Sequence, residues 1–136
     1  MNTGRFVGAG VAVFVVRFLL NYLFYGVLIH PQYEAISNAH PGMFREVIPA
    51  YAVLDLLAAF LIVWFFVKCG GGYGGGVKAG VTLGILLGLF GPVLCGLYMF
   101  FSVTYYPTSL LGTEIVYVLV AHAIQGAVAA LVYKTA

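Results

Sequence analysis

Four long apolar runs, separated by shorter polar or glycine-rich stretches, dominate the pattern of the chain. The first run is Phe6–Ile29, and only Arg17 and Asn21 interrupt it. The others cover residues 47–67, 77–103 and 114–133. Each approaches or exceeds the roughly 20 residues that an α-helix needs to cross a bilayer. Because only helices and closed barrels satisfy their backbone polar groups in lipid, the pattern predicts an all-α, integral membrane four-helix bundle.

The composition agrees with a lipid environment. Of the 136 residues, 63% are hydrophobic and 7% are charged, whereas a soluble domain carries roughly 25% charged residues. We therefore expect residues 1–136 to form a single transmembrane domain in contact with the lipid bilayer. The net charge of +2 is too small to favour nucleic acid as a partner. The first run exceeds the roughly 7–15 apolar residues of a signal-peptide core, so it is expected to remain as a span.

The charged residues at the span ends predict an orientation. Basic residues gather at the ends that share one side: Arg5, Lys68, Lys78 and Lys134. The opposite ends carry three acidic residues and one basic residue: Glu34, Glu46, Glu114 and Arg45. The positive-inside rule therefore places both termini in the cytoplasm. Six tyrosines near the outer ends fit an interfacial aromatic belt, with core packing as the alternative for one or two of them: Tyr25, Tyr33, Tyr51, Tyr105, Tyr106 and Tyr117.

Two of the linkers are distinctive. The outer segment His30–Glu46 holds two His-Pro pairs, which favour extended or turn geometry. The segment Cys69–Gly76 reads CGGGYGGG, and no Gly-Lys-Ser/Thr follows it, so it is interpreted as a flexible turn rather than a phosphate cradle.

An internal repeat is also visible. Asn21–Pro31 aligns without gaps on Leu97–Pro107, and Tyr51–Lys68 aligns on Tyr117–Lys134. The alignment predicts two parallel helical hairpins related about the membrane normal, with chance similarity between apolar segments as the alternative.

Three segments carry a resemblance to known proteins. They are FLLNYLFYGVLIHPQYEA at 18–35, GGVKAGVTLGILLGLFG at 75–91 and IQGAVAALVYK at 124–134. Their pattern resembles a loose group of small four-span bacterial membrane proteins, those of domain of unknown function 1761. The resemblance covers most of the chain. It implies a four-helix fold in a bacterial cytoplasmic membrane, and it implies no catalytic activity.

The third run has a glycine at every fourth position from 76 to 88, which places these glycines on one helical face. Such a stripe lets another helix approach closely, as in G-x-x-x-G packing. The expected packing residues are Gly80, Gly84 and Gly88, with Gly126 on the fourth span as partner. The stripe could pair within the chain or with another subunit. Pro92, further along the same run, should kink the helix or free a backbone carbonyl.

Five polar side chains fall inside the spans: Arg17, Asn21, Asp55, His122 and Gln125. At about 1.5 Å of rise per residue they lie within roughly one helical turn of depth. Arg17 and Asp55 have opposite charge, and either alone would be costly in lipid, so a buried pair is expected. The layer could be a structural clasp between spans 1, 2 and 4. It could equally be a binding pocket or one side of an ion path.

His122 could ligate the metal of a porphyrin or chlorophyll-type pigment, since neutral imidazole is a common ligand. A core histidine near Asp55 is the alternative. A bound lipid is the alternative to such a pigment. The spacing of His30 and His40 matches no zinc pattern, so no metal site is predicted. No catalytic motif is recognisable, and an enzyme is not expected.

Three functions remain open from these residues. The first is a small accessory or scaffold subunit that packs through its glycine-rich helix against larger integral membrane subunits or against itself. The second is a small-molecule or ion binding or transport protein that uses the Arg17–Asp55–His122 layer. The third is a pigment- or haem-binding subunit that uses His122.

Overall fold

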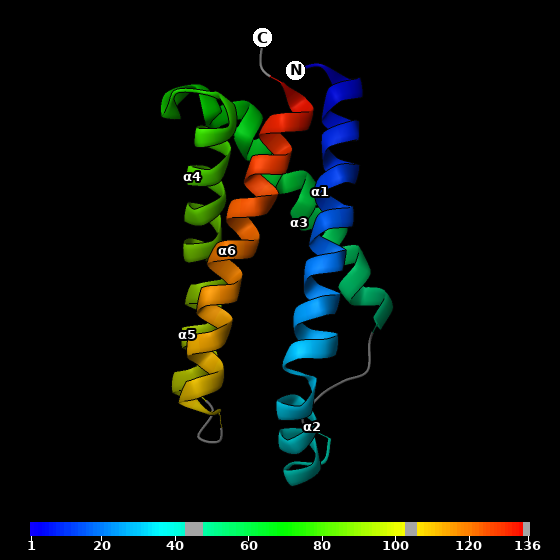
Figure 1. The fold of residues 1–136 in the computed structure, drawn as a ribbon, viewed down its shortest axis with the longest axis vertical. Coiled ribbons are helices and arrows are strands. Elements are labelled where there is room, and N and C mark those ends of the chain that lie inside the picture. Colours follow the sequence, from blue (N-terminus) through cyan, green and yellow to red (C-terminus); the bar gives the residue numbers. More distant parts are fainter. Residues whose placement is uncertain (43–47, 103–105, 135–136) are drawn as a thin grey trace.

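The computed structural model describes residues 1–42, 48–102 and 106–134, and this part of the chain is all-helical. Four segments are long and apolar enough to cross a membrane: Thr3–Leu28, Pro49–Tyr73, Gly76–Ser102 and Thr108–Tyr133. They pack together, with both termini at one end (Figure 1). The prediction of an all-α, multi-pass membrane protein is confirmed at this level.

The spans are built from helices with two π-helical interruptions. The first span is α1 (Thr3–Leu23) followed by a π-helical turn, η1 (Phe24–Leu28). A short helix, α2 (His30–Ala39), precedes the second span, α3 (Ile48–Cys69), and a 3₁₀ turn, η2 (Gly70–Tyr73), ends it. The third span joins α4 (Gly76–Gly88), a second π-helical turn, η3 (Leu89–Val93), and α5 (Leu94–Ser102). The fourth span is α6 (Thr108–Tyr133).

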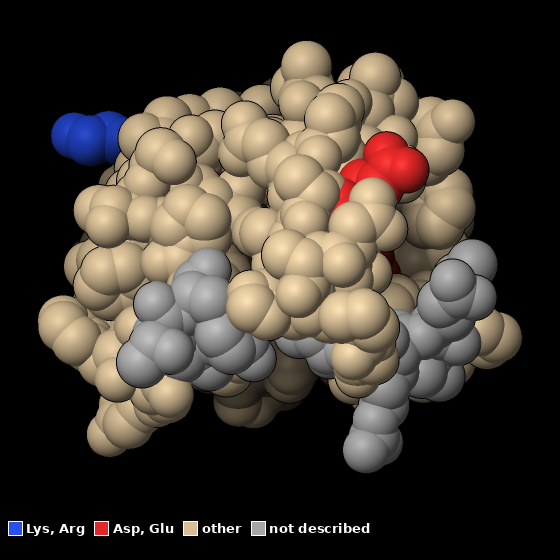
Figure 2. All heavy atoms as spheres, turned by 90° about the horizontal axis from the view of Figure 1, so that it is seen from below, with Lys and Arg blue, Asp and Glu red and all other residues tan. Residues whose placement is uncertain are grey.

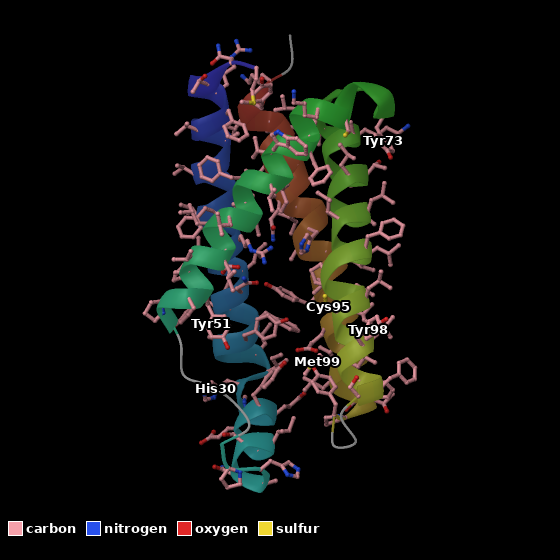
Figure 3. The ribbon with its side chains drawn as sticks, turned by 180° about the vertical axis from the view of Figure 1, so that it is seen from behind. His30, Tyr51, Tyr73, Cys95, Tyr98 and Met99 are labelled. Carbon is pink, nitrogen blue, oxygen red and sulfur yellow. The ribbon has the colours of Figure 1, made fainter. Side chains whose placement is uncertain are left out.

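Helix α6 lies at the centre of the arrangement, in contact with α1, α3, α4 and α5, while α1 packs on α3. Seen from behind, α3 runs obliquely, and its Tyr51 end lies farthest from α5 (Figure 3). We call the part of the bundle near the termini the terminal half, and the part near α2 the α2 half.

The glycine stripe joins α4 to α6 of the same chain. A Cβ atom on Gly80 would collide with the Gly126 carbonyl oxygen, and one on Gly84 with the His122 carbonyl oxygen. A Cβ on Gly126 would meet the Gly80 carbonyl oxygen in turn. Only glycine permits this backbone approach. The predicted stripe is therefore covered by the fourth span, and it presents no free face to another subunit.

The segment after Ile29 differs from its prediction. Extended or turn geometry was expected at the two His-Pro pairs. The chain does turn at His40 and Pro41, but α2 occupies His30–Ala39, with Pro31 in its first turn. Pro is favoured there because its missing N–H would be unpaired in any case. Tyr33 and Ile36, one turn apart, pack against buried Phe24, Ile29 and Leu110, which anchors the helix.

The fourth span begins earlier than predicted. The apolar pattern placed its start at Glu114, whereas α6 begins at Thr108, directly after the extended Pro107. Leu110 and Leu111 are buried, and this burial keeps the first turns helical. Glu114 therefore lies inside the helix, about 9 Å from its start at 1.5 Å per residue.

The turn between α3 and α4 explains the glycine run that links them. Gly74, Gly75 and Gly76 have φ angles of 86°, 71° and 63°. Three successive residues in this region suit only glycine. In η3, Pro92 can neither donate to the preceding turn nor fit a regular α-helix, and the expected disturbance takes the form of a π-helical turn.

The two chain ends are tied to each other. The Asn2 backbone N–H donates to the Tyr133 hydroxyl at 3.2 Å, and the Arg5 guanidinium donates to the Lys134 carbonyl at 2.8 Å. At the opposite end acidic atoms are visible, and the described basic atoms appear only at the rim (Figure 2).

Residues 103–105 of the second copy of the predicted repeat lie outside the described residues, and the repeat stays a prediction.

Two separate apolar clusters form the core. The larger lies in the terminal half and draws on all four spans: Ala9, Val13, Ala59, Ile62, Val63, Phe66, Ala79, Leu83, Ala129, Ala130 and Tyr133. The smaller lies in the α2 half and consists of Phe24, Ile29 and Leu110, with Tyr33, Ile36, Tyr106 and Tyr117 packed against it. The predicted polar layer falls between the two clusters.

Candidate functional site

The Arg17–Asp55 pair is the centre of the polar layer. Arg17 Nε donates to Asp55 Oδ1 at 2.6 Å, which joins α1 to α3. The two side chains keep 16% and 14% of their surface exposed. Arg17 lies near the middle of the first span, where a lone cation is costly, so the pair neutralises both groups.

Two amides and a phenol extend this pair into a network. Arg17 Nη1 donates to Gln125 Oε1 at 3.2 Å, and Gln125 is only 1% exposed. Asn21 Nδ2 donates to both Asp55 oxygens, at 3.0 and 3.1 Å. The Tyr117 hydroxyl donates to Asn21 Oδ1 at 2.6 Å. Every buried polar side-chain atom among the described residues has a partner. The network therefore fastens α1, α3 and α6 together.

Aromatic rings continue from Tyr117 toward the α2 end. Phe24 stacks on Tyr117 with ring centres 3.7 Å apart. Tyr25 meets Tyr117 edge-on at 5.6 Å and Tyr33 at 6.1 Å. Each edge-to-face or stacked pair of rings at these distances stabilises the fold by about 0.5–1.5 kcal/mol beyond the effect of its buried area. The rings thus connect the polar network to the residues around α2.

A second polar cluster lies where these rings end. The hydroxyls of Tyr33 and Tyr106 both donate to the Glu114 carboxylate, one to each oxygen. Burial, and then the hydrogen bond to Glu114, raises the pKa of each hydroxyl well above its ordinary value. Both phenols therefore keep their protons at neutral pH and remain donors. The cluster joins α2 to α6.

The six belt tyrosines are used differently from one another. Tyr51 is 60% exposed, as a belt residue should be. Tyr33, Tyr106 and Tyr117 are half-buried and hydrogen-bonded, so core packing applies to three tyrosines rather than to one or two. Tyr105 lies outside the described residues.

Two hollows border these groups, both in the α2 half. The Phe24 groove has a volume of about 660 Å³ and lies along α6, lined by Phe24, Ser109, Gly112, Thr113, Val116, Tyr117 and Val120. The Tyr25–Glu114 hollow has a volume of about 160 Å³. Its lining comes from η1, η3, α5 and α6: Tyr25, Pro92, Val93, Gly96, Leu111, Glu114, Ile115 and Val118.

His122 stands apart from the rest of the predicted layer. Its Nδ1 lies 2.9 Å from the Val118 carbonyl oxygen of its own helix, and the residue is 7% exposed. A Cβ atom on Gly88 would come within 3.1 Å of the His122 ring, so the ring packs against α4. The expected hydrogen-bond partner near Asp55 is thus replaced by a backbone carbonyl. His122 lines neither hollow, and the pigment hypothesis gains no cavity from it.

The sequence interpretation missed the part played by Glu114 and Tyr117. Glu114 was taken as the start of a span, and Tyr117 as a belt residue. A signal was nevertheless present, because positions 114, 117 and 125 recur at intervals that place them along one side of a helix. The structure brings together four of the five predicted layer residues and adds Tyr117.

No family model, curated protein or solved structure matches the chain. The resemblance to the domain of unknown function therefore stays an expectation, and function is argued from the site.

Proposed function

We propose that the protein binds a small molecule or ion in its α2 half, reached from the outer face of the membrane. This corresponds to the second function left open by the sequence, without His122. One observation carries the proposal. The hollows and the Tyr33–Tyr106–Glu114 cluster lie on one side of the Arg17–Asp55 pair, and the large apolar core lies on the other.

The orientation is part of the proposal. Lys68 and Lys78 flank the turn at the terminal end, and the Arg5 side chain lies beside Lys134 there. The positive-inside rule then makes the α2 half the outer half. The apolar core of the terminal half would close the inner side. Transport would require that this half open, whereas binding would not.

The accessory-subunit hypothesis loses its principal support. It rested chiefly on the glycine stripe, whose partner could lie in this chain or in another subunit, and the stripe is occupied by α6 of the same chain. Large apolar side chains remain exposed on the outer surface of the bundle, as lipid contact alone requires. No described feature specifically favours a protein partner.

The test is a ligand screen on the full chain purified in mild detergent. The panel holds alkali and ammonium salts, choline, tetramethylammonium, neutral amino acids and short carboxylates. A ligand at 100 times its dissociation constant stabilises the folded state by about 2.7 kcal/mol, which thermal unfolding detects. Proteoliposome uptake of each stabilising compound then distinguishes transport from binding alone.

Three matched glycine-to-leucine variants show which hollow binds a stabilising compound. Gly96→Leu fills the Tyr25–Glu114 hollow, and Gly112→Leu fills the Phe24 groove, while Gly8→Leu adds the same side chain to an exposed position on α1. We expect stabilisation by at least one compound, lost in one of the first two variants and kept in Gly8→Leu. A panel without any effect, or equal effects in all three variants, would contradict the proposal.

A further inference from the structure

We infer that the Tyr25–Glu114 hollow is a site for a small organic cation, of the quaternary or alkyl ammonium class. The inference rests on the proposed function and names its ligand class. It follows from four properties of the hollow: its backbone, its charge, its aromatic wall and its size.

The backbone around the hollow is irregular on two sides. Tyr25 belongs to the π-helical turn η1, while Pro92 and Val93 belong to the π-helical turn η3. Single π-helical turns inside α-helices are rare and frequently mark functional sites. Here both π-helical turns of the described chain contribute side chains to one hollow.

Among the described residues, no basic side chain compensates the charge of the hollow. Asp55 is neutralised by Arg17, and this is the only ion pair among the described residues. Glu114 accepts two phenolic hydrogen bonds and pairs with no basic side chain in that part of the chain. A cation would compensate this charge where the surrounding walls are apolar.

The aromatic wall favours a particular kind of cation. The Tyr25 ring borders the hollow and is held by edge-on contacts with Phe24, Tyr33 and Tyr117. Alkylated ammonium groups bind the faces of aromatic rings without needing hydrogen bonds. The remaining lining, including Leu111 and Ile115, can contact methyl groups.

The volume limits the ligand. At about 160 Å³ the hollow is smaller than the roughly 300–1,000 Å³ of sites for drug-sized molecules. A compact cation such as tetramethylammonium, or the head group of choline, suits this space. A large planar pigment does not.

The experiment is calorimetric titration of the purified full chain with tetramethylammonium chloride, with sodium chloride at equal concentration as the salt control. Tert-butanol serves as a neutral ligand of similar shape. We expect tetramethylammonium to bind at least about tenfold more tightly than tert-butanol, a difference equivalent to 1.4 kcal/mol. Equal affinities would overturn the inference, and this comparison needs no variant.

Variants assign the binding to the hollow. Glu114→Gln should weaken tetramethylammonium binding at least about tenfold, and Tyr25→Leu about fivefold. Glu34→Gln removes an exposed carboxylate on α2 and should leave binding unchanged. Because Glu114→Gln also disturbs two tyrosine contacts, Gly96→Leu supplies a second variant that blocks the hollow from α5 and should abolish binding.

Two further outcomes would overturn the inference, and they have different consequences for the proposed function. Binding that survives Glu114→Gln and Gly96→Leu would place the cation elsewhere. Absence of tetramethylammonium binding, together with stabilisation by another compound that Gly112→Leu removes, would reject this ligand class and leave the proposed function standing.

Discussion

The terminal half and the α2 half of the bundle are held together by different physical means. In the terminal half, small residues bring helices into backbone contact, and the core is apolar throughout. In the α2 half, charged, amide and phenolic groups bond across helices, and the aromatic rings leave two hollows. The first half is built for close packing. The second combines a defined structure with space for a ligand.

The difference between the two halves bears on the role of the Arg17–Asp55 pair. Arg17 and Asp55 lie at the boundary between the halves, and they bond to each other, to Gln125 and to Asn21. We therefore assign the pair a structural role at the inner boundary of the α2 half. The side chains available to a ligand lie nearer the α2 end, at Tyr25 and Glu114.

The largest expected effect belongs to the terminal half. Gly84→Leu would place a side chain where the His122 carbonyl lies, and backbone cannot move aside as a side chain can. We expect no folded bundle, because overpacking already costs about 1–3 kcal/mol where side chains can adjust. The size-exclusion profile and the thermal unfolding of the purified variant in detergent show whether a folded bundle forms. Gly8→Leu, at an exposed position, is the control, and equal behaviour of the two variants would show that α4 and α6 do not meet.

The second largest loss of stability is expected at the Arg17–Asp55 pair, which lies at the boundary between the halves. Asp55→Asn leaves Arg17 charged without its partner, and breaking a buried pair typically costs about 3–5 kcal/mol. The double variant Arg17→Met with Asp55→Leu removes both charges and should lie closer to the parent in thermal stability. A single variant as stable as the parent would mean that the two side chains do not pair in the membrane.

A smaller effect is expected within the α2 half. Tyr117→Phe removes the hydroxyl that donates to Asn21 but keeps the ring stacked on Phe24. The loss should be about 1 kcal/mol, the usual net value of one such hydrogen bond. Tyr51→Phe, at a residue with an exposed ring, should change stability by less than about 0.5 kcal/mol. If both variants have the same stability, the network does not extend to Tyr117.

The sequence predicted the terminal half better than the α2 half, for a physical reason. Apolar length and glycine spacing are properties of single helices, so the spans and the stripe of Gly80, Gly84 and Gly88 were predictable. The pairing of Arg17 with Asp55 followed from opposite charge and equal depth. Depth, however, does not say which neighbour a side chain faces, and His122 faces α4 rather than Asp55.

The start of α6 and the existence of α2 were missed because local polarity suggested loops. In both cases a few apolar side chains decide the conformation by burial against residues distant in sequence: Leu110 in α6, and Ile36 in α2. The Tyr25–Glu114 hollow likewise joins segments about 90 residues apart, and it leaves no local pattern in the sequence.

The central claim is that the α2 half can be reached from outside while the terminal half is closed. It is tested most directly by thiol accessibility, in a chain whose free cysteines Cys69 and Cys95 are replaced by alanine. A membrane-impermeant maleimide is added to the outer face of sealed cells that express Gly96→Cys or Ala129→Cys. The account predicts labelling of Gly96→Cys, slowed by tetramethylammonium, and none of Ala129→Cys, whose parent side chain is fully buried. Labelling of Gly96→Cys only from the cytoplasmic face, or equal labelling of both thiols, would contradict it.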